Sequence, residues 1–215
     1  MAETEDQRPE LNIPAIILAA GRSRRMRAFK PLLKFGNSTV IDCCIQNFRD
    51  AGVEQVVVVA GHRADELRRH LYHIAIVNNP QPDADMSSSI RLGVQALSAE
   101  SKAVLITPVD HPAVPPQVIS DLITQWKTGA KLVVPEYDGH GGHPVIIDLS
   151  FREELLKVDQ QRNGLRGFFE VHRSEVVRVP VESPYIARDM DTWDDYVALH
   201  QELFGSPPAE QKSLE

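Results

Sequence analysis

Short apolar runs alternate with amphipathic segments along the first two thirds of the chain. The runs are four or five residues long and end near turn residues, which is typical of strands buried on both faces of a sheet. Between them, apolar residues recur every three or four positions, as in helices that pack along one side. This alternation predicts an α/β protein with a mostly parallel sheet and helices on both faces. Strands are expected at 15–19, 56–60, 74–77, 103–106 and 132–135, and helices at 40–51, 62–71, 86–97 and 115–127.

The pattern changes after Pro135. A turn rich in glycine and histidine, at residues 137–142, leads into a further apolar run at 144–147. Because such a turn sends the chain back on itself, we expect one reversed strand or hairpin near 135–148. Beyond it the sequence predicts two short helices, a strand and a last helix, at 151–157, 165–171, 176–179 and 193–203.

Length, charge and cysteine content limit the class of protein. The 215 residues, 42% of them hydrophobic, favour a single domain over 13–204, with disordered tails at 1–12 and 205–215. The net charge of -7 argues against a nucleic-acid partner. We find no signal peptide and no apolar run of membrane length, so we expect no membrane partner. Cys43 and Cys44 are adjacent and unsuited to a structural disulfide, which favours a reducing, cytoplasmic location.

Positive charge is concentrated after the first strand. Four arginines and Lys30 follow Gly21 within one short segment. A glycine that permits a backbone turn, followed by cations, suits the binding of a phosphate at the edge of a sheet. Lys30 is far enough along to reach back over a ligand as a mobile point charge. A solvated basic loop after a core strand has the same pattern, so the residues alone leave both interpretations open.

Two aspartates have both a structural and a chemical interpretation. Asp110 follows a buried strand between two prolines, where we expect a surface carboxylate that is either a turn residue or a Mg²⁺ ligand. Asp191 precedes the last helix, and the residues alone favour a helix cap over a metal ligand there. For the helix that begins at Met86, we expect Ser87 or Ser88 as the cap.

Five motifs, in order along the chain, resemble the MobA-like nucleotidyltransferases, and within that family the molybdenum cofactor cytidylyltransferase group. The resemblance extends from about Ala15 to Leu199, nearly the whole predicted domain. Each motif is weak alone, but five at matching order and spacing are a strong joint signal. The motifs are Leu18-Ala19-Ala20-Gly21-x-Ser23-x-Arg25-Met26-x-x-x-Lys30, Met86-Ser87-x-Ser89-x-x-x-Gly93, Pro108-x-Asp110-x-Pro112, Gly142-His143-Pro144 and Asp189-x-Asp191-Thr192-x-x-Asp195.

The resemblance implies a Rossmann-like, Mg²⁺-dependent enzyme. Such an enzyme joins a nucleoside monophosphate from a triphosphate to a phosphorylated acceptor, such as molybdopterin, and releases pyrophosphate. Catalysis would consist of positioning and charge stabilisation. The implied site residues are Leu18, Ala19, Ala20 and Gly21 for the base and ribose, Ser87 for further nucleotide contacts, Arg25 and Lys30 for the triphosphate, Asp110 and Asp191 for Mg²⁺, and His143 for the acceptor.

The same resemblance bears on the substrates. Ala19-Ala20-Gly21 resembles the CTP-using branch of the family, so CTP is favoured over GTP, and a transient contact with a molybdoenzyme or its chaperone is implied. Arg27 and Asp85 stand where the family usually has glycine, which leaves the identity of the substrate open. A sugar- or alditol-phosphate nucleotidyltransferase, or a non-catalytic nucleotide or pterin carrier, are the alternatives.

Overall fold

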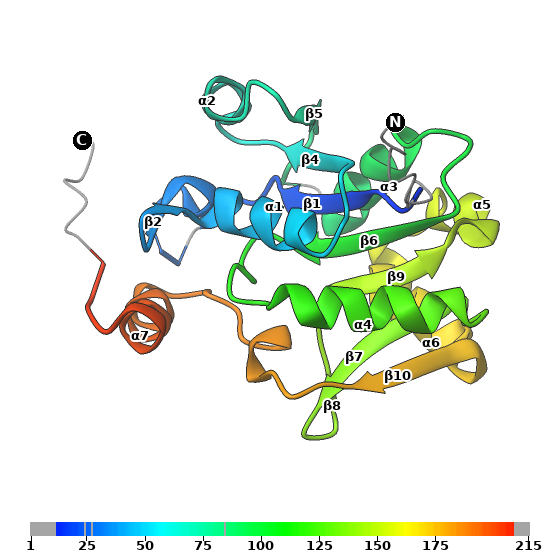
Figure 1. Cartoon of the computed structure of the whole chain (residues 1–215). Helices are drawn as coiled ribbons and strands as arrows, with labels where there is room; N and C mark the ends of the chain where they lie inside the picture. The colour runs from blue at the N-terminus through cyan, green and yellow to red at the C-terminus, as the bar shows by residue number, and fades with distance from the viewer. Residues whose placement is uncertain (1–11, 24, 27, 84, 209–215) are drawn as a thin grey trace, which may run out of the picture.

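A mixed sheet of mostly parallel strands forms the centre of the protein. We describe it from a computed structural model, in which residues 12–23, 25–26, 28–83 and 85–208 are described. The strands of the sheet are β1 (Ala15–Ala19), β4 (Val56–Ala60), β5 (Ala75–Asn78), β6 (Ala103–Pro108), β7 (Leu132–Tyr137), β8 (His140–Gly141), β9 (Val145–Asp148) and β10 (Val176–Pro180). Their order is β10-β7-β9-β6-β1-β4-β5, with β8 paired to β7 (Figure 1).

Among these strands only β8 and β9 run against their neighbours. β9 is antiparallel to both β6 and β7, and β8 is antiparallel to β7. The remaining pairs are parallel. The predicted α/β fold, with one reversed strand or hairpin near 135–148, is therefore confirmed. β1 and β4 are buried at every position, which explains why their sequences are continuously apolar rather than alternating.

Helices cover both faces of the sheet (Figure 1). They are α1 (Val40–Asp50), α2 (Ala64–His70), α3 (Met86–Gln95), α4 (Pro116–Lys127), α5 (Arg152–Leu155), α6 (Gly164–Val171) and α7 (Trp193–Phe204). Apolar side chains of α1, α4 and α7 belong to one buried cluster, and those of α3, α5 and α6 belong to another. Each cluster packs against one face of the sheet, as the amphipathic periodicity of the helices predicts.

The strand register places the two main motifs side by side. In β1, Leu18 pairs with Pro108 of β6 on one side and with Val59 of β4 on the other. The loop that follows β1 and the Asp110 loop that follows β6 therefore leave the sheet at adjacent positions. In open α/β sheets, this carboxyl edge of the strands is where ligands bind.

The helix caps differ from the sequence predictions. Asp85 caps α3 by accepting a 2.9 Å hydrogen bond from the Ser88 amide, so the prediction of a serine cap is wrong. Thr192 caps α7, and Asp195 completes a capping box with it. The favoured interpretation of Asp191 as a cap is therefore also wrong, and its carboxylate is available for another role.

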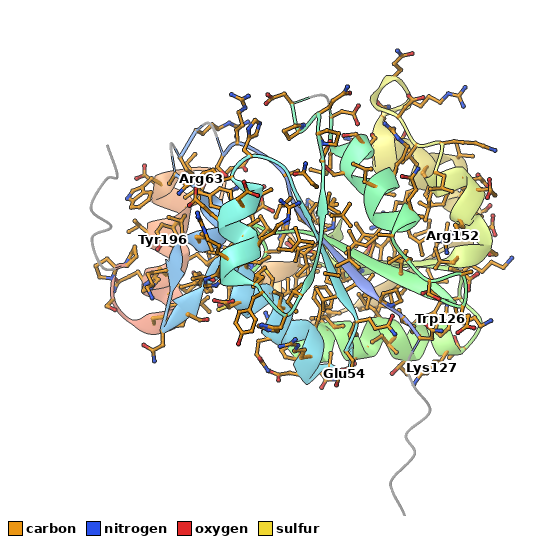
Figure 2. All side chains as sticks on the ribbon, turned by 90° about the horizontal axis from the view of Figure 1, so that it is seen from above. Glu54, Arg63, Trp126, Lys127, Arg152 and Tyr196 are labelled. Atoms are coloured by element: carbon orange, nitrogen blue, oxygen red, sulfur yellow. The ribbon has the colours of Figure 1, made fainter. Side chains whose placement is uncertain are left out.

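Two long side chains, Arg152 and Tyr196, link peripheral elements to one another (Figure 2). Arg152 at the start of α5 donates to the carbonyls of Leu97 and Ser98, just beyond the end of α3, at 2.7 and 2.9 Å. The Tyr196 hydroxyl of α7 donates to the carbonyl of Lys34, in a short hairpin of β2 (Lys34–Phe35) and β3 (Ser38–Thr39). The second contact holds α7, which follows Asp191, against the β2–β3 hairpin.

The ends of the described chain also contact the domain. The Asn12 carbonyl accepts a 3.0 Å hydrogen bond from Lys102, and the Ser206 carbonyl lies 2.7 Å from Nδ1 of His200. Residues 1–11 and 209–215 of the predicted tails, and Arg24 and Arg27, lie outside the described residues. In the described part of the chain, no helix has the length and apolar character needed to cross a membrane.

Candidate functional site

Lys30 lies between two aspartates at the carboxyl edge of the sheet. Its Nζ is 3.0 Å from Oδ2 of Asp110 and 3.4 Å from Oδ1 of Asp191. Arg25 approaches the other oxygen of Asp191 at 2.9 Å. Lys30 is only 6% exposed, so it is a fixed, buried charge rather than the mobile one expected from the sequence. The structure thus gathers four of the residues singled out in the sequence, although 166 positions separate Arg25 from Asp191.

Asp110 is more enclosed than a surface carboxylate. Its side chain is 19% exposed, which corrects the expectation from the sequence. Burial alone would raise the pKa of Asp110, but the Lys30 ammonium and, to a lesser extent, His111 outweigh it and lower the pKa. Asp110 is therefore ionised at neutral pH. Its Oδ1 is buried and makes no hydrogen bond within the described part of the chain.

A nearby third carboxylate, Asp189, was not singled out as a site residue. Burial raises the pKa of Asp189, and the negative charges of Asp191 and Asp110 raise it further. Its sequence signal is its place in the same Asp-x-Asp motif as Asp191. The site therefore holds a local excess of carboxylate that a cation would relieve.

The first cavity, of about 310 Å³, opens beside these charges. The Leu18–Gly21 segment lines it, together with Lys30, Asp110 and Asp191. Gly61 allows the surrounding loops to approach closely, because a Cβ there would lie 2.7 Å from the Ala20 carbonyl oxygen and 2.4 Å from Cβ of Pro82.

A cluster of Arg22, His62 and Asp83 links the loops around the first cavity. Nε of Arg22 is 2.6 Å from Nε2 of His62, and its guanidinium is 2.5 Å from Oδ2 of Asp83. The three residues follow β1, β4 and β5, so they link the loops after three neighbouring strands. This arrangement keeps the loop after β1 over the carboxyl edge of the sheet.

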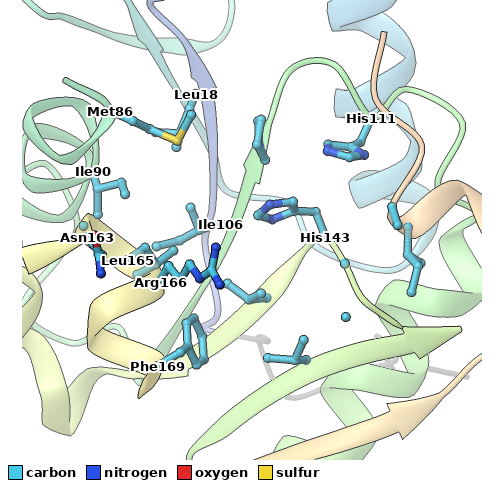
Figure 3. Close-up of a pocket in the computed structure, with 18 of the residues that line it drawn as sticks. Leu18, Met86, Ile90, Ile106, His111, His143, Asn163, Leu165, Arg166 and Phe169 are labelled. Carbon is cyan, nitrogen blue, oxygen red and sulfur yellow. The ribbon is translucent and has the colours of Figure 1, made fainter. Parts of the chain in front are cut away.

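A second and larger cavity, of about 1150 Å³, adjoins the first (Figure 3). It lies over the face of the sheet that α3 and α6 cover, and Ile106 and Val134 belong to its floor. Figure 3 shows Phe169 and Arg166 on the α6 side and Leu18 and Met86 on the α3 side. The two cavities share a wall made of Leu18, Asp85, Met86 and Pro108.

Ser87 and His143 line the second cavity rather than the first. Ser87 is buried, and its neighbour Ser89 faces the first cavity, where its hydroxyl accepts a 2.9 Å hydrogen bond from Asn79. Of these two serines, Ser89 therefore lies nearer the charged site, and the role of Ser87 in nucleotide contact stays a prediction. Asn79 was not singled out, and the end of an apolar strand was its only signal.

Two histidines form one side of the second cavity (Figure 3). The rings of His111 and His143 are 5.1 Å apart, and Nδ1 of each is buried and makes no hydrogen bond with any described residue. Burial, together with the charge of a protonated His111, lowers the pKa of His143 to about 4. Burial also lowers the pKa of His111. Both rings are therefore neutral at physiological pH and offer one donor and one acceptor each.

The sequence matches the MobA-like NTP transferase domain family over residues 15–177. The chain belongs to this family. It is therefore, by family, a nucleotidyltransferase, and the resemblance found in the motifs is confirmed. It is similar to the molybdenum cofactor cytidylyltransferase of Escherichia coli (strain K12), with 26% identity over 192 residues, which are 88% of this chain and 96% of that protein.

Solved structures show the same fold. The Rv0371c homologue from Mycobacterium sp. strain JC1 superimposes with a TM-score of 0.76 and 26% identity, covering 90% of this chain and 97% of that chain. Rv0371c from Mycobacterium tuberculosis H37Rv, solved in complex with manganese, gives a TM-score of 0.73 and 25% identity, covering 89% of this chain and 99% of that chain. The MobA-like nucleotidyltransferase is thus similar to these structures over most of its length.

Proposed function

We propose that this nucleotidyltransferase transfers the cytidylyl group of CTP to the phosphate of molybdopterin or a closely related acceptor and releases pyrophosphate. The observation that carries the proposal is the meeting of two cavities beside Lys30, Asp110 and Asp191. Two substrates bound in adjoining cavities would have their reacting groups together at the shared wall. The similarity to the Escherichia coli cytidylyltransferase supports the choice of CTP and of the acceptor.

Asp110 and Asp191 would hold Mg²⁺. Their carboxylates come from separate loops and already converge on one cation, the Lys30 ammonium. The buried Oδ1 of Asp110, which has no hydrogen-bond donor in the described part of the chain, also suits a metal ligand. When bound, Mg²⁺ would neutralise negative charge on the phosphates at the reacting centre. The manganese complex of the Mycobacterium tuberculosis neighbour supports a divalent cation in this role.

The proposed reaction exchanges one phosphoanhydride bond for another. An acceptor phosphate oxygen forms a bond to the α-phosphorus of CTP while the bond from that phosphorus to the pyrophosphate oxygen breaks. Lys30 and Arg25 stabilise the charge on the departing pyrophosphate. A phosphate nucleophile is already ionised near neutral pH, so the reaction needs no strong general base. Because its pKa is lowered to about 4, His143 is a weak base, which agrees with a role in acceptor contact rather than in proton removal.

The remaining site residues hold the two substrates. Leu18, Ala19, Ala20 and Gly21 line the first cavity and would contact the base and ribose of CTP. Ser87 lines the second cavity, its neighbour Met86 lines both cavities, and Ser89 lines the first. We also propose that the enzyme works in the cytoplasm and passes its product to a molybdoenzyme or its chaperone.

The proposal is tested by measuring pyrophosphate release. CTP, GTP, ATP and UTP are each incubated with the protein and Mg²⁺, with and without molybdopterin, and the expected release occurs with CTP and molybdopterin together. A preference for GTP would overturn the cytidylyl assignment. Release with sugar or alditol phosphates, but not with molybdopterin, would favour the other transferase class. Nucleotide binding without release for any acceptor would indicate a carrier.

A further inference from the structure

The Lys30 ammonium lies where the two proposed metal ligands converge. Its Nζ is 3.0 Å from Oδ2 of Asp110 and 3.4 Å from Oδ1 of Asp191. A divalent ion bound to the same two oxygens, at about 2.1 Å from each, would lie within about 5 Å of Nζ. At this separation two cations repel each other strongly in an enclosed site, where little water screens them. Lys30, in its present position, therefore opposes the binding of a metal ion.

The carboxylates of this site already have counterions. Arg25 is 2.9 Å from Oδ2 of Asp191, but its side chain is 73% exposed, so water screens much of that attraction. The Lys30 side chain is only 7% exposed, so it supplies most of the compensating charge in the enclosed part of the site. Even when Asp189 is included, three carboxylates face two cations among the described residues. This leaves a single excess negative charge to attract a divalent ion.

Lys30 cannot leave the two aspartates unless another anion receives it. An unpaired ammonium in a buried position is costly, because the charge loses both its water and its partners. Among the described residues, the ion-pair partners of Lys30 are Asp110 and Asp191. Lys30 also lines the first cavity, so its flexible stem can carry the ammonium into that cavity. A triphosphate bound there would supply the anion that receives it.

We propose that Lys30 is an exchangeable counterion, which holds Asp110 and Asp191 in the nucleotide-free protein and moves to the triphosphate of the bound nucleotide. This inference rests on the proposed function for the metal ligands and for the place of the nucleotide. The exchange leaves the two carboxylates to the metal ion and gives the triphosphate the cation that stabilises the departing pyrophosphate. The site therefore takes up the divalent cation together with the nucleotide and binds the free ion weakly.

The test measures Mn²⁺ binding in the absence of nucleotide and acceptor. Wild-type protein is compared with Lys30→Gln, which removes the charge and keeps a hydrogen-bond donor, and with Lys34→Gln, a control at an exposed position of β2 outside both cavities. Water-proton relaxation gives the Kd, because it distinguishes Mn²⁺ on the protein from Mn²⁺ in solution. Since the competing cation is lost, Lys30→Gln should bind Mn²⁺ about tenfold more tightly than the wild type, whereas Lys34→Gln should stay within about twofold. Lys30→Arg, which keeps the charge, should gain no affinity.

A second condition tests the role of the nucleotide. With saturating CTP and no acceptor, the wild type should bind Mn²⁺ at least about tenfold more tightly than without CTP, and the advantage of Lys30→Gln should disappear. Thermal unfolding checks the fold of each variant, and the comparison of the wild type with and without CTP needs no variant. An Mn²⁺ affinity of the wild type that CTP leaves unchanged would overturn the inference. So would a Kd for Lys30→Gln that is no tighter than that of the wild type without CTP, or an advantage of Lys30→Gln that persists with CTP.

Failure of this inference can be told apart from failure of the proposed function. The Mn²⁺ measurements contain no acceptor and need no turnover. If the wild type releases no pyrophosphate with any acceptor, the proposed function fails, while tighter Mn²⁺ binding by Lys30→Gln that is lost with CTP would still support the exchange. If pyrophosphate is released but Lys30→Gln and the wild type bind Mn²⁺ equally without CTP, the proposed function stands and the inference fails.

Discussion

The first cavity takes much of its lining from one continuous motif, whereas the second is assembled from α3, the turn before β9, α6 and β10. The first is small and ends in charges that are already paired with one another, at Lys30, Asp110 and Asp191. The second is several times larger, has an apolar floor, and is bordered by two neutral histidines and by arginines. In terms of the proposed function, this difference assigns the shared chemistry to the first cavity and the choice of acceptor to the second.

The largest expected effect comes from removing the charge of Asp110. Asp110→Asn keeps the shape of the side chain but loses a carboxylate beside the reacting phosphates, so kcat with Mg²⁺ should fall at least about a hundredfold. We choose asparagine because Asp110→Ala would leave the buried Lys30 next to an empty space, and an uncompensated buried charge destabilises the fold. Turnover is measured as pyrophosphate release, and folding is checked by thermal unfolding.

Asp194→Asn is the matched control for this experiment. Asp194 lies in the exposed first turn of α7, three residues after Asp191, and outside both cavities. The control should retain normal turnover. Near-normal kcat in Asp110→Asn would mean that the paired charges of the first cavity are structural. The first cavity would then not be the site of the reaction.

The second prediction concerns the neutral histidines of the second cavity. Burial and the neighbouring His111 lower the pKa of His143 from its ordinary value of 6.5 to about 4, although the charge of Asp110 opposes this shift. Between these values, the unfolded chain binds a proton that the folded protein does not, so the free energy of unfolding falls as the pH is lowered through this window. The loss should be about 2 kcal/mol, less than the full shift implies because part of the ring faces the open cavity.

His143→Gln removes this proton-binding difference while keeping a polar side chain. Urea unfolding at several pH values between about 4 and 6.5 should therefore show a shallower loss of stability in His143→Gln than in the wild type. His111 has a lowered pKa for the same reason and should leave part of the slope in place. Parallel curves for the two proteins would show that the histidine side of the second cavity is not enclosed.

More of the first cavity than of the second could be recognised from the sequence. Periodicity identified the strands and helices, because continuous apolar runs and amphipathic spacing are local consequences of burial. The Leu18–Gly21 segment of the first cavity could also be recognised, because its residues are contiguous in the sequence. Phe169 and Arg173 could not be recognised in this way, because only the packing of α6 and β10 brings them to the second cavity. The burial of Lys30 could not be predicted either, since it depends on two aspartates far away in the sequence.

A third prediction tests whether Phe169 helps to bind the acceptor. Phe169→Ala removes an aromatic surface from the α6 side of the second cavity, so KM for molybdopterin should rise about tenfold, a change of ~1.4 kcal/mol, while KM for CTP is unchanged. Val171→Ala is the control, because Val171 is on the same helix and is 79% exposed. A parallel rise in both KM values would show that the two cavities do not act as separate binding sites.

The smallest expected effect is at Ala20, in the wall of the first cavity. Its methyl group lies 3.0 Å from the position that a Cβ on Gly61 would occupy, so the loops after β1 and β4 are packed tightly around it. The methyl also limits the backbone where the base would approach, which favours a pyrimidine over the larger purine. Wild-type protein should therefore prefer CTP to GTP in a competition assay with equal concentrations of both.

Ala20→Gly should weaken this preference but not abolish it. A difference of one methyl group in a pocket discriminates by only about 1–3 kcal/mol, and Arg22 still holds the surrounding loops through His62 and Asp83. We expect the ratio of kcat/KM for CTP over GTP to fall by about five- to tenfold in Ala20→Gly, the lower end of this range. An unchanged ratio would place recognition of the base elsewhere in the first cavity. A loss of activity with both nucleotides would instead show that Ala20 supports the loop, because Gly gives it more freedom than the bound state allows.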